Sequence, residues 1–519
     1  MTEPVGPGGS VARRAASGVG WIIAWRMVSR NLGLLSTLVL VRLLSPGDFG
    51  LVALANGLIS MVDALTSIGV YDALVRARDP NRATYDTCFT VNALRNIATA
   101  IVIVIVAEPV AILFNDHRLT IVMLALSVRS LLSAGLNVRV VDFRRDLDFR
   151  KEFNLNTWCR VVGIIATVSC ALIWPSYWAL IIGLISMHIV QLPLSYWMVP
   201  YLPRFSLAAW RSIFSFSMWT WAQTLLLQAR DRTDAFVISR FVGTKPFGTY
   251  SVGLELGTLP ATELMEPLSR ALFSGFATLH NAAAGTGKMF IDVFGVSVML
   301  VLPAGFGISM VADPMVRIML GDQWTAAIIV VQVIALSSIS STFVQPAGAL
   351  VNAIGRPHAA FYVGIVSAIV KLVTMLLLVP AIGLFGASLS LAICSAVELI
   401  LFAAVVLPRV GVTVGALLRQ MIRPVIGAGA MIAVLWSLHM AWTPADANTY
   451  LGTCIDAAQR SLVGATVYVS VVGLLWLAAG RPSGPEQFLL STGMQMLRRF
   501  SVVLPTMLRR IGISRRAGA

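Results

Sequence analysis

The chain has 519 residues, of which 57% are hydrophobic and only 12% are charged, and its formal net charge is +15. Soluble globular proteins carry about 25% charged residues, so this composition excludes a soluble enzyme and indicates that a lipid bilayer is the main solvent. The basic residues gather in short segments between apolar runs and in the C-terminal tail, as the positive-inside rule expects. The positive charge therefore reports membrane topology, and we expect no nucleic acid among the partners.

Apolar runs of roughly 20 residues recur along almost the whole chain, and each is long enough to cross a hydrocarbon core of about 30 Å. They predict an all-α integral membrane protein of about fourteen transmembrane helices with no sizeable soluble domain. The expected helices occupy residues 18–44, 49–72, 87–110, 119–138, 155–174, 177–200, 212–241, 247–276, 289–312, 324–353, 357–380, 384–408, 420–441 and 460–480.

Arginine-rich segments alternate with nearly uncharged loops in the N-terminal half. If the N-terminus is cytoplasmic, the basic segments at 76–82, 139–151 and 204–211 all fall on the inner side of the membrane. We therefore predict a multi-pass protein of the bacterial inner membrane with both termini in the cytoplasm.

An internal repeat connects the two halves of the chain. Five residues recur at one constant offset of 198 positions, in that Trp21, Val39, Arg42, Phe49 and Gly50 match Trp219, Val237, Arg240, Phe247 and Gly248. Six helices per repeat is an even number, so both repeats enter the membrane in the same direction. The predicted organisation is an N-terminal cytoplasmic tail (1–17), an N-terminal six-helix lobe (18–203), a C-terminal six-helix lobe (204–410), two additional helices (411–480) and a basic cytoplasmic tail (481–519).

Arginines inside the predicted helices are candidates for substrate binding. An ionisable side chain at bilayer depth costs at least roughly 2.5 kcal/mol, so it faces a cavity or a partner. Four arginines of the N-terminal lobe meet this description, on three helix faces that also carry Ser, Thr or Asn, and they are Arg26, Arg30, Arg95 and Arg129. A guanidinium group stays charged and grips phosphate oxygens in bidentate fashion, so we predict a cavity for an anionic group such as pyrophosphate. The alternative is that each arginine pairs internally, for instance with Asp63 on the second helix.

Charged residues of both signs elsewhere in the helices are candidates for ion coupling or gating. They are Asp63, Asp234, Glu255, Glu263, Glu266, Lys371 and Glu398. A buried carboxylate can bind Na⁺ or H⁺ during a transport cycle, and the alternative is a set of salt bridges that locks one conformation. We expect no other cofactor and no catalysis, because the GTGK at 285–288 lacks both the first glycine and the Ser/Thr of a phosphate loop and no metal or nucleophile motif occurs.

Four segments resemble the Wzx-type polysaccharide transporter family of the multidrug/oligosaccharidyl-lipid/polysaccharide exporter superfamily, namely LVRLLSPGDFGLVALANGL, VVDFRRDLDFRKEF, PRFSLAAWRSIFSFS and RDRTDAFVISRFVGTKPFGTYSVG. The resemblance covers roughly residues 15–410. It implies a V-shaped transporter of two six-helix lobes that alternates access between the two sides of the membrane. It also implies that the substrate is an undecaprenyl-pyrophosphate-linked oligosaccharide, flipped from the cytoplasmic to the periplasmic leaflet.

The leading hypothesis is therefore a flippase for a surface polysaccharide such as lipopolysaccharide or exopolysaccharide. Its expected partners are the lipid-linked oligosaccharide, membrane lipids, and a polysaccharide polymerase and glycosyltransferases. One alternative is a cation-coupled drug exporter of the same superfamily, which would favour acidic residues over arginines in its cavity. The other alternative is a membrane scaffold that recruits the enzymes of polysaccharide assembly through its loops and basic tail.

Overall fold

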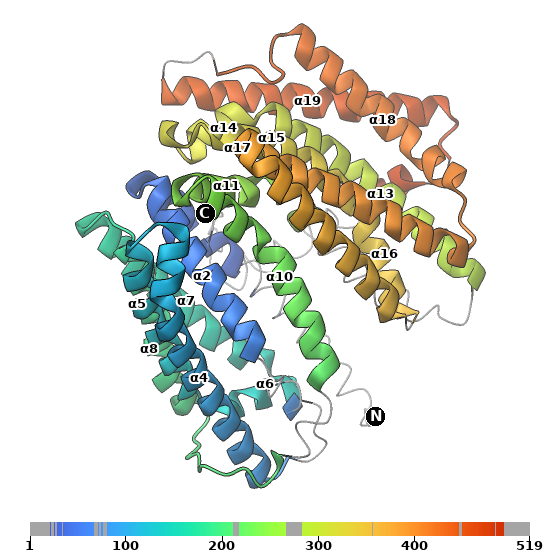
Figure 1. Ribbon diagram of the computed structural model, residues 1–519. Coiled ribbons are helices and arrows are strands. Elements are labelled where there is room, and N and C mark those ends of the chain that lie inside the picture. The colour runs from blue at the N-terminus through green and yellow to red at the C-terminus, as the bar shows by residue number, and fades with distance from the viewer. Residues whose placement is uncertain are drawn as a thin grey trace, which may run out of the picture. The chain divides into compact units, whose positions relative to one another are not determined.

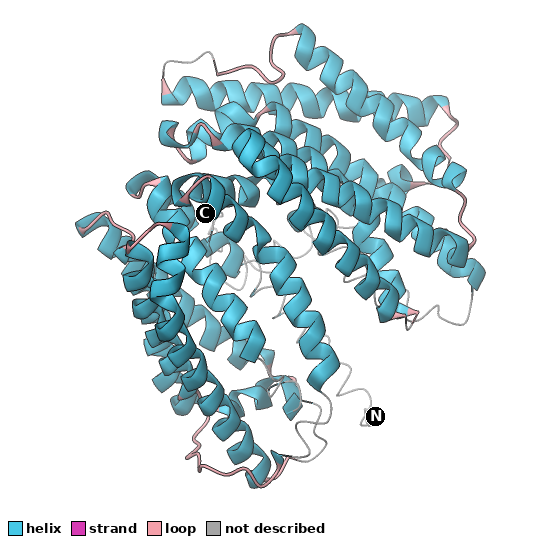
Figure 2. Ribbon diagram, viewed as in Figure 1, coloured by secondary structure: helices cyan, strands magenta, loops and turns pink. Residues whose placement is uncertain are grey.

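The computed structural model describes residues 21, 25, 28–33, 35–66, 71, 74–75, 80–210, 217–265, 283–354, 356–445, 449–482 and 484–491. Within these ranges all regular secondary structure is helical (Figure 2), which confirms the predicted all-α class. Nine of the described helices are long and apolar enough to cross a membrane, or ten if one bent pair counts as a single span. The expected helices at 18–44, 49–72, 212–241 and 247–276 lie partly outside the described residues, so the total of fourteen stays a prediction.

The chain packs into two compact units, each of which gathers segments that are distant in the sequence. The first unit comprises Met1–Gly253, Val316–Val330 and Gly364–Ser390, and the second comprises Leu254–Met315, Val331–Val363 and Leu391–Ala519. The division follows packing density and not the internal repeat. The lobe boundaries expected from the repeat therefore stay a prediction.

The first unit contains most of the helices of the N-terminal half (Figure 1). Those wholly within it are α2 (Pro46–Thr66), α4 (Arg82–Phe114), α5 (Arg118–Ala134), η1 (Val138–Val141), α6 (Asp142–Arg145), α7 (Phe149–Ile173), α8 (Trp178–Met198), α10 (Ser217–Phe241) and η3 (Asp322–Trp324). Four helices contribute residues to both units, and they are α11 (Thr244–Gly257), α14 (Ala312–Met319), α15 (Ala327–Ser337) and α17 (Pro357–Val410).

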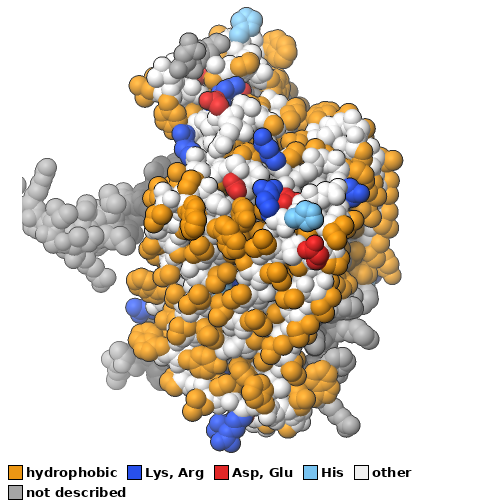
Figure 3. All heavy atoms as spheres, turned by 60° about the vertical axis from the view of Figure 1, so that its left-hand side comes forward, with side chains coloured by type: hydrophobic (Ala, Val, Ile, Leu, Met, Phe, Trp, Pro, Cys, Tyr) orange, Lys and Arg blue, Asp and Glu red, His pale blue; other side chains and the backbone are white. Residues whose placement is uncertain are grey.

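The helix α4 shows how the sequence builds a membrane span with one polar face. The side chain of Asn81 caps its first turn by accepting a hydrogen bond from the backbone N–H of Thr84 at 2.9 Å. Asn96 and Thr99 are 3% and 0% exposed, whereas Ile105 is 66% exposed. The polar face therefore packs inward while the apolar face is left for lipid, which is the reverse of a soluble helix. Figure 3 shows a face of the molecule on which hydrophobic side chains greatly outnumber charged ones.

Two glycines of the repeat bring the helices α2 and α11 into backbone contact. A Cβ atom on Gly50 would overlap the carbonyl oxygen of Thr244, and a Cβ atom on Gly248 would overlap the carbonyl oxygen of Pro46. The offset of 198 residues relates Gly50 to Gly248 and Pro46 to Thr244, so it exchanges the two contacts, and the approach is reciprocal, as in a two-fold interface. The matching glycines are needed because only a residue without a Cβ atom permits this approach.

The long helix α17 contains the break that the sequence predicts between 357–380 and 384–408. Its backbone leaves helical geometry at Ile382 (φ −134°, ψ 19°) and at Gly383 (φ 60°, ψ −133°). Glycine supplies the positive φ that other residues adopt only with strain. The expected pair of separate helices is thereby confirmed.

The second unit contains η2 (Pro260–Met265), α13 (Ala283–Met310), η4 (Ser338–Ser340), α16 (Ser341–Ala353), α18 (Val414–Ser437) and α19 (Tyr450–Ala478). The rings of Phe290 and Phe294 pack against Phe343 at centroid distances of 5.5 and 5.9 Å, which joins α13 to α16. The hydroxyl of Tyr468 on α19 donates to the carbonyl of Met299 at 2.9 Å. The two additional C-terminal helices thus pack onto this core.

A buried arginine fixes the turn between α18 and α19. Arg460 is 2% exposed, and its Nε donates to Oδ1 of Asp456 at 2.8 Å. Its two Nη atoms donate to the backbone carbonyls of Met440, Thr443 and Pro444 at 2.9–3.2 Å. This arginine satisfies carbonyls that follow the end of α18, so its role is structural.

Candidate functional site

A polar cavity of about 250 Å³ lies within the first unit, among α2, α4, α5 and α8. It is lined by Asp63, Tyr71, Asn92, Arg95, Asn96, Arg129, Ser130, Ser133, Leu136 and His188. The structure therefore brings two of the four predicted arginines together with the predicted Asp63. The amides and hydroxyls around them come from the same polar helix faces of α4 and α5.

Arg129 on α5 is held by two side chains of α2. Its Nη2 lies 3.4 Å from Oδ2 of Asp63, and its Nη1 donates to Oδ1 of Asn56 at 3.2 Å. The side chains of Arg129 and Asp63 are 20% and 32% exposed, so the ion pair borders the cavity and is not sealed in the protein. The predicted alternative of internal pairing with Asp63 thus holds for Arg129 in this conformation.

Arg95 on α4 faces the same cavity with a weaker, neutral partner. Its Nη2 donates to Oδ1 of Asn96 at 3.4 Å. The amide of Asn96 in turn donates to the carbonyl oxygen of Asn92 at 2.8 Å, and the amide of Asn92 donates to the carbonyl of Ser133 at 3.2 Å. This chain of amides orients the donors and acceptors of the cavity wall. The guanidinium of Arg95 is thereby positioned, and no acidic side chain of the described ranges forms a salt bridge with it.

The electrostatic balance of the cavity is positive. Its lining carries the two guanidinium groups of Arg95 and Arg129 and the one carboxylate of Asp63, which leaves one net positive charge. A site with this charge, among neutral hydrogen-bonding groups, is suited to an anion that also carries hydroxyl groups. Within the described ranges, no group of three or more His, Cys, Asp or Glu side chains is arranged to hold a metal ion.

The other two predicted arginines are not placed at this cavity. Arg30 belongs to the helical segment 28–33 and is not among the residues that line it. Arg26 lies outside the described residues. Their role in substrate binding stays a prediction.

Two further groups were missed by the sequence analysis. His188 on α8 lines the cavity, and its Nδ1 donates to the carbonyl of Leu184 at 2.9 Å, which leaves Nε2 for the cavity. Arg160 on α7 approaches the first helix closely, since a Cβ atom on Gly33 would lie 2.7 Å from its Nη2. The predicted helix starts at 155, so Arg160 lies near its end and was not counted among the residues at bilayer depth. The observed helix starts at Phe149, which places Arg160 well inside it.

Two of the predicted coupling residues form a buried ion pair in the first unit. Nζ of Lys371 on α17 lies 2.7 Å from Oδ1 of Asp234 on α10, and both side chains are less than 10% exposed. Tyr250 donates to Oδ2 of Asp234 at 3.4 Å, and Nζ of Lys371 also donates to the carbonyl of Arg230 at 3.1 Å. These contacts are those of a structural salt bridge. A role in ion coupling stays a prediction.

Three of the remaining predicted acids are less deeply buried than Asp234. Glu255 on α11 and Glu263 on η2 are exposed, and Glu398 on α17 is half-buried. Glu266 lies outside the described residues, as does the basic tail from 492 onwards.

Comparison with known proteins identifies a matching family and several relatives. A family model described as polysaccharide biosynthesis protein matches residues 39–329. The chain is 22% identical over 428 residues to the lipopolysaccharide biosynthesis protein WzxC of Escherichia coli strain K12, covering 82% of each chain. It is 25% identical over 396 residues to the succinoglycan biosynthesis transport protein ExoT of Rhizobium meliloti strain 1021, covering 73% of this chain and 80% of ExoT.

Solved structures of low sequence identity show the same fold. The lipid II flippase MurJ in an inward closed conformation matches with a TM-score of 0.70 at 13% identity, over 88% of this chain and 100% of that chain. An inward-facing transporter of the multidrug resistance MATE family matches with a TM-score of 0.53 at 14% identity, over 77% of this chain and 95% of that chain. The match of the family model extends over more than half of the chain. The chain therefore belongs to the polysaccharide biosynthesis protein family, and its resemblance to the Wzx-type transporters of the multidrug/oligosaccharidyl-lipid/polysaccharide exporter superfamily is confirmed.

Proposed function

We propose that the chain flips an undecaprenyl-pyrophosphate-linked oligosaccharide across the bacterial inner membrane by alternating access, for the biosynthesis of a surface polysaccharide. The observation that carries this proposal is the cavity in which Arg95 and Arg129 meet neutral amides and hydroxyls. The family and the fold support the coarser role of a multi-pass membrane transporter or flippase of lipid-linked material. The orientation with both termini in the cytoplasm is part of the proposal.

The arginines would hold the pyrophosphate of the substrate. Among the described residues, the guanidinium of Arg95 donates only to the neutral amide of Asn96, at 3.4 Å, so its remaining N–H groups are available for two parallel bonds to phosphate oxygens. Asn92 and Ser130 can exchange hydrogen bonds with sugar hydroxyls, because amides and hydroxyl groups both donate and accept. Both kinds of group lie around one cavity, as a headgroup that joins phosphate to sugar requires.

In this site the carboxylate of Asp63 competes with the substrate's phosphate for the guanidinium of Arg129. A phosphate that approaches Arg129 replaces the carboxylate of Asp63 at 3.4 Å, and Asp63 takes its place again when the substrate leaves. Binding then exchanges one anion for another at the same guanidinium. This exchange limits the affinity and favours release on the opposite side of the membrane.

The test is the flipping of a fluorescent undecaprenyl-pyrophosphate-linked oligosaccharide in proteoliposomes that contain the purified chain. We expect Arg95→Ala to lower the initial rate roughly 10-fold or more, since hydrogen bonds to charged groups contribute about 1.5–3 kcal/mol. Arg95→Lys should be intermediate because it keeps the charge and loses the planar fork. The matched control is Arg118→Ala, because Arg118 is exposed, pairs with Asp116 and lies outside the cavity.

The alternative functions give different results in the same system. A wild-type rate in well-folded Arg95→Ala would show that the cavity is not the substrate site. Transport of cationic drugs without flipping of the lipid would identify a drug exporter. Polysaccharide assembly that survives the loss of flipping would identify a scaffold for the polymerase and glycosyltransferases. A Na⁺ or H⁺ gradient across the vesicles tests the coupling ion.

A further inference from the structure

A second and larger cavity lies at the N-terminal end of α4, also within the first unit. Its volume is about 550 Å³, and it is lined by Pro80, Arg82, Tyr85, Arg139, Pro200, Tyr201 and Leu202. We call it the Arg82–Arg139 cavity. It shares no lining residue with the cavity of Arg95 and Arg129, so it is a separate site. Its size is in the range of small-molecule pockets, which is about 300–1,000 Å³.

In both arginines of this cavity, Nε is the atom that lies next to an aspartate. Nε of Arg82 lies 3.8 Å from Oδ2 of Asp86, and Nε of Arg139 lies 3.2 Å from Oδ2 of Asp142. Neither aspartate is among the lining residues. The side chains of Arg82 and Arg139 remain 60% and 40% exposed. Nε of each guanidinium is thus held by an aspartate, and Nη2 of Arg82 also donates to the carbonyl of Leu202 at 3.5 Å. Within the described part of the chain, Nη1 of Arg82 and both Nη atoms of Arg139 stay available for a contact with phosphate.

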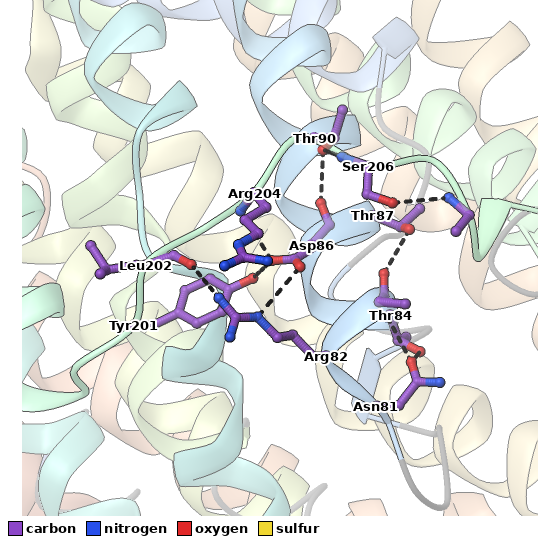
Figure 4. Close-up of polar contacts among 12 residues, drawn as sticks. Asn81, Arg82, Thr84, Asp86, Thr87, Thr90, Tyr201, Leu202, Arg204 and Ser206 are labelled. Atoms are coloured by element: carbon purple, nitrogen blue, oxygen red, sulfur yellow. Dashed lines mark hydrogen bonds and ion pairs between the residues drawn. The ribbon is translucent and has the colours of Figure 1, made fainter.

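The wall opposite Arg82 is built by the segment that follows α8 (Figure 4). The hydroxyl of Tyr201 and the backbone N–H of Arg204 both donate to Oδ1 of Asp86, the latter at 3.1 Å. Farther along the segment, the backbone N–H of Ser206 donates to Oγ1 of Thr90 at 2.9 Å. The segment is thus tied along the first two turns of α4. Asp86 is 5% exposed and pairs with Arg82, so that guanidinium balances its charge.

The second arginine is positioned by a similar cluster. The guanidinium of Arg139 lies over the ring of Tyr85, with Cζ 5.3 Å from the ring centroid. Tyr85 donates to Oδ1 of Asp142, and Arg145 donates to the Tyr85 hydroxyl at 2.9 Å. The cavity lining itself contains two guanidinium groups and no carboxylate. With the paired groups behind the lining included, the three guanidinium groups of Arg82, Arg139 and Arg145 stand against the two carboxylates of Asp86 and Asp142, which leaves one net positive charge.

The position of this cavity along α4 places it at the level of lipid headgroups. The helix has 33 residues and is roughly 50 Å long at about 1.5 Å per residue, whereas the hydrocarbon core is about 30 Å thick. The expected span of α4 begins at residue 87, five residues after Arg82, so Arg82 lies roughly 8 Å beyond the core at about 1.5 Å per residue. Leu202 and Phe205, beside the cavity, are 82% and 78% exposed. Exposed apolar side chains next to basic ones are typical of a membrane interface.

We propose that the Arg82–Arg139 cavity binds the phosphate of an anionic membrane phospholipid. The two guanidinium groups bind the phosphate, and Leu202 and Phe205 contact the adjoining part of the lipid. A free phosphate ion would make no use of these exposed apolar side chains. The pyrophosphate of a lipid-linked oligosaccharide shares the same chemistry, and the experiment distinguishes it from a bulk phospholipid. The site is independent of the proposed flipping function.

The test is the binding of phosphatidylglycerol to the purified, delipidated full chain, measured by native mass spectrometry over a range of lipid concentrations. Each basic residue near an anionic surface contributes about a fivefold change in affinity, so Arg82→Gln with Arg139→Gln should weaken binding roughly 25-fold. Glutamine keeps hydrogen-bond donors and removes the charge. The control is Lys151→Ala, because Lys151 is exposed and pairs only locally with Asp148 at 3.2 Å.

Parallel titrations identify the source of the phosphate. Phosphatidylcholine and glycerol phosphate should bind the wild type much more weakly than phosphatidylglycerol. Equal phosphatidylglycerol affinity in the wild type and in a double variant that keeps its elution volume and helical circular dichroism would overturn the proposal. A loss confined to undecaprenyl pyrophosphate would also overturn it, since the cavity would then serve the transport substrate. If the double variant fails to fold, Arg139→Lys alone should still weaken binding, and an unchanged affinity would count against the site.

Discussion

The buried pair of Asp234 and Lys371 allows a quantitative test of structure against function. We expect Lys371→Met to destabilise the chain by about 3–5 kcal/mol, because it leaves the carboxylate of Asp234 buried without its cation. One kcal/mol shifts the melting temperature of a domain of 150–250 residues by about 2–4 °C, so the apparent melting temperature should fall by roughly 6–20 °C. In the assay, the purified chain is heated in detergent, and the folded fraction that remains is measured by size-exclusion chromatography.

The double variant separates the cost of an orphaned charge from the net value of the pair. Asp234→Asn combined with Lys371→Met removes both charges, and we expect it to be much more stable than Lys371→Met alone. The matched control is Asp231→Asn, because the side chain of Asp231 is 61% exposed and should contribute little. A loss under about 1 kcal/mol for Lys371→Met, or a double variant as unstable as the sum of both single variants, would refute the argument.

The same variants address ion coupling. If Asp234 only stabilises the fold, the double variant keeps the dependence of flipping on a Na⁺ or H⁺ gradient. If that dependence disappears while the protein stays folded, Asp234 is a coupling carboxylate as well as a structural one.

Two further predictions concern packing. Gly50→Ala should destabilise the chain by about 1–3 kcal/mol, because its Cβ atom would overlap the carbonyl of Thr244 and force α2 away from α11. Thermal unfolding compares this variant with Gly47→Ala in the same helix, where the atom nearest to the new Cβ would be 3.6 Å away. Equal stability of the two variants would contradict the prediction. Arg460→Ala should cost about 3 kcal/mol or more, since it removes the donor of a fully buried network. Limited proteolysis between α18 and α19 should then accelerate, whereas the exposed neighbour Ser461→Ala should resemble the wild type.

Local signals in the sequence were sufficient for much of the fold. Hydropathy located the apolar helices because the bilayer imposes a minimum length on each span. The break at Gly383 was visible because glycine and the flanking residues interrupt two runs of adequate length. The matching positions of Gly50 and Gly248 revealed the repeat, and their reciprocal approach gives that match a physical cause. Helix ends were less accurate, since Phe149 begins its helix in a polar segment that hydropathy does not detect.

The candidate site was predicted only in part. The residues on one face of a helix can be read from the local sequence, but the helix that this face contacts cannot. Periodicity placed Arg95 and Arg129 on polar faces, and the structure brings these faces to one cavity. The pairing of Lys371 with Asp234 joins residues on two distant helices, so no pattern within either helix specifies it. His188 was missed because a single histidine in an apolar run gives no periodic signal. Tertiary packing determines the meeting of Arg95 with Arg129, the pairing of Lys371 with Asp234 and the position of His188.

The charge of the cavity explains why an acid belongs in a site proposed for an anion. A diphosphate that links lipid to sugar carries about two negative charges, and Arg95 with Arg129 would match them fully. A carrier that binds its substrate too tightly cannot release it, since binding that is equally strong throughout the cycle lowers dissociation without speeding the crossing. Asp63 reduces the net charge of the lining to +1, and in the proposed cycle it would return to Arg129 once the phosphate departs. Under the proposed function, the ion pair between Asp63 and Arg129 would therefore make the cavity suitable for transport and not merely for binding.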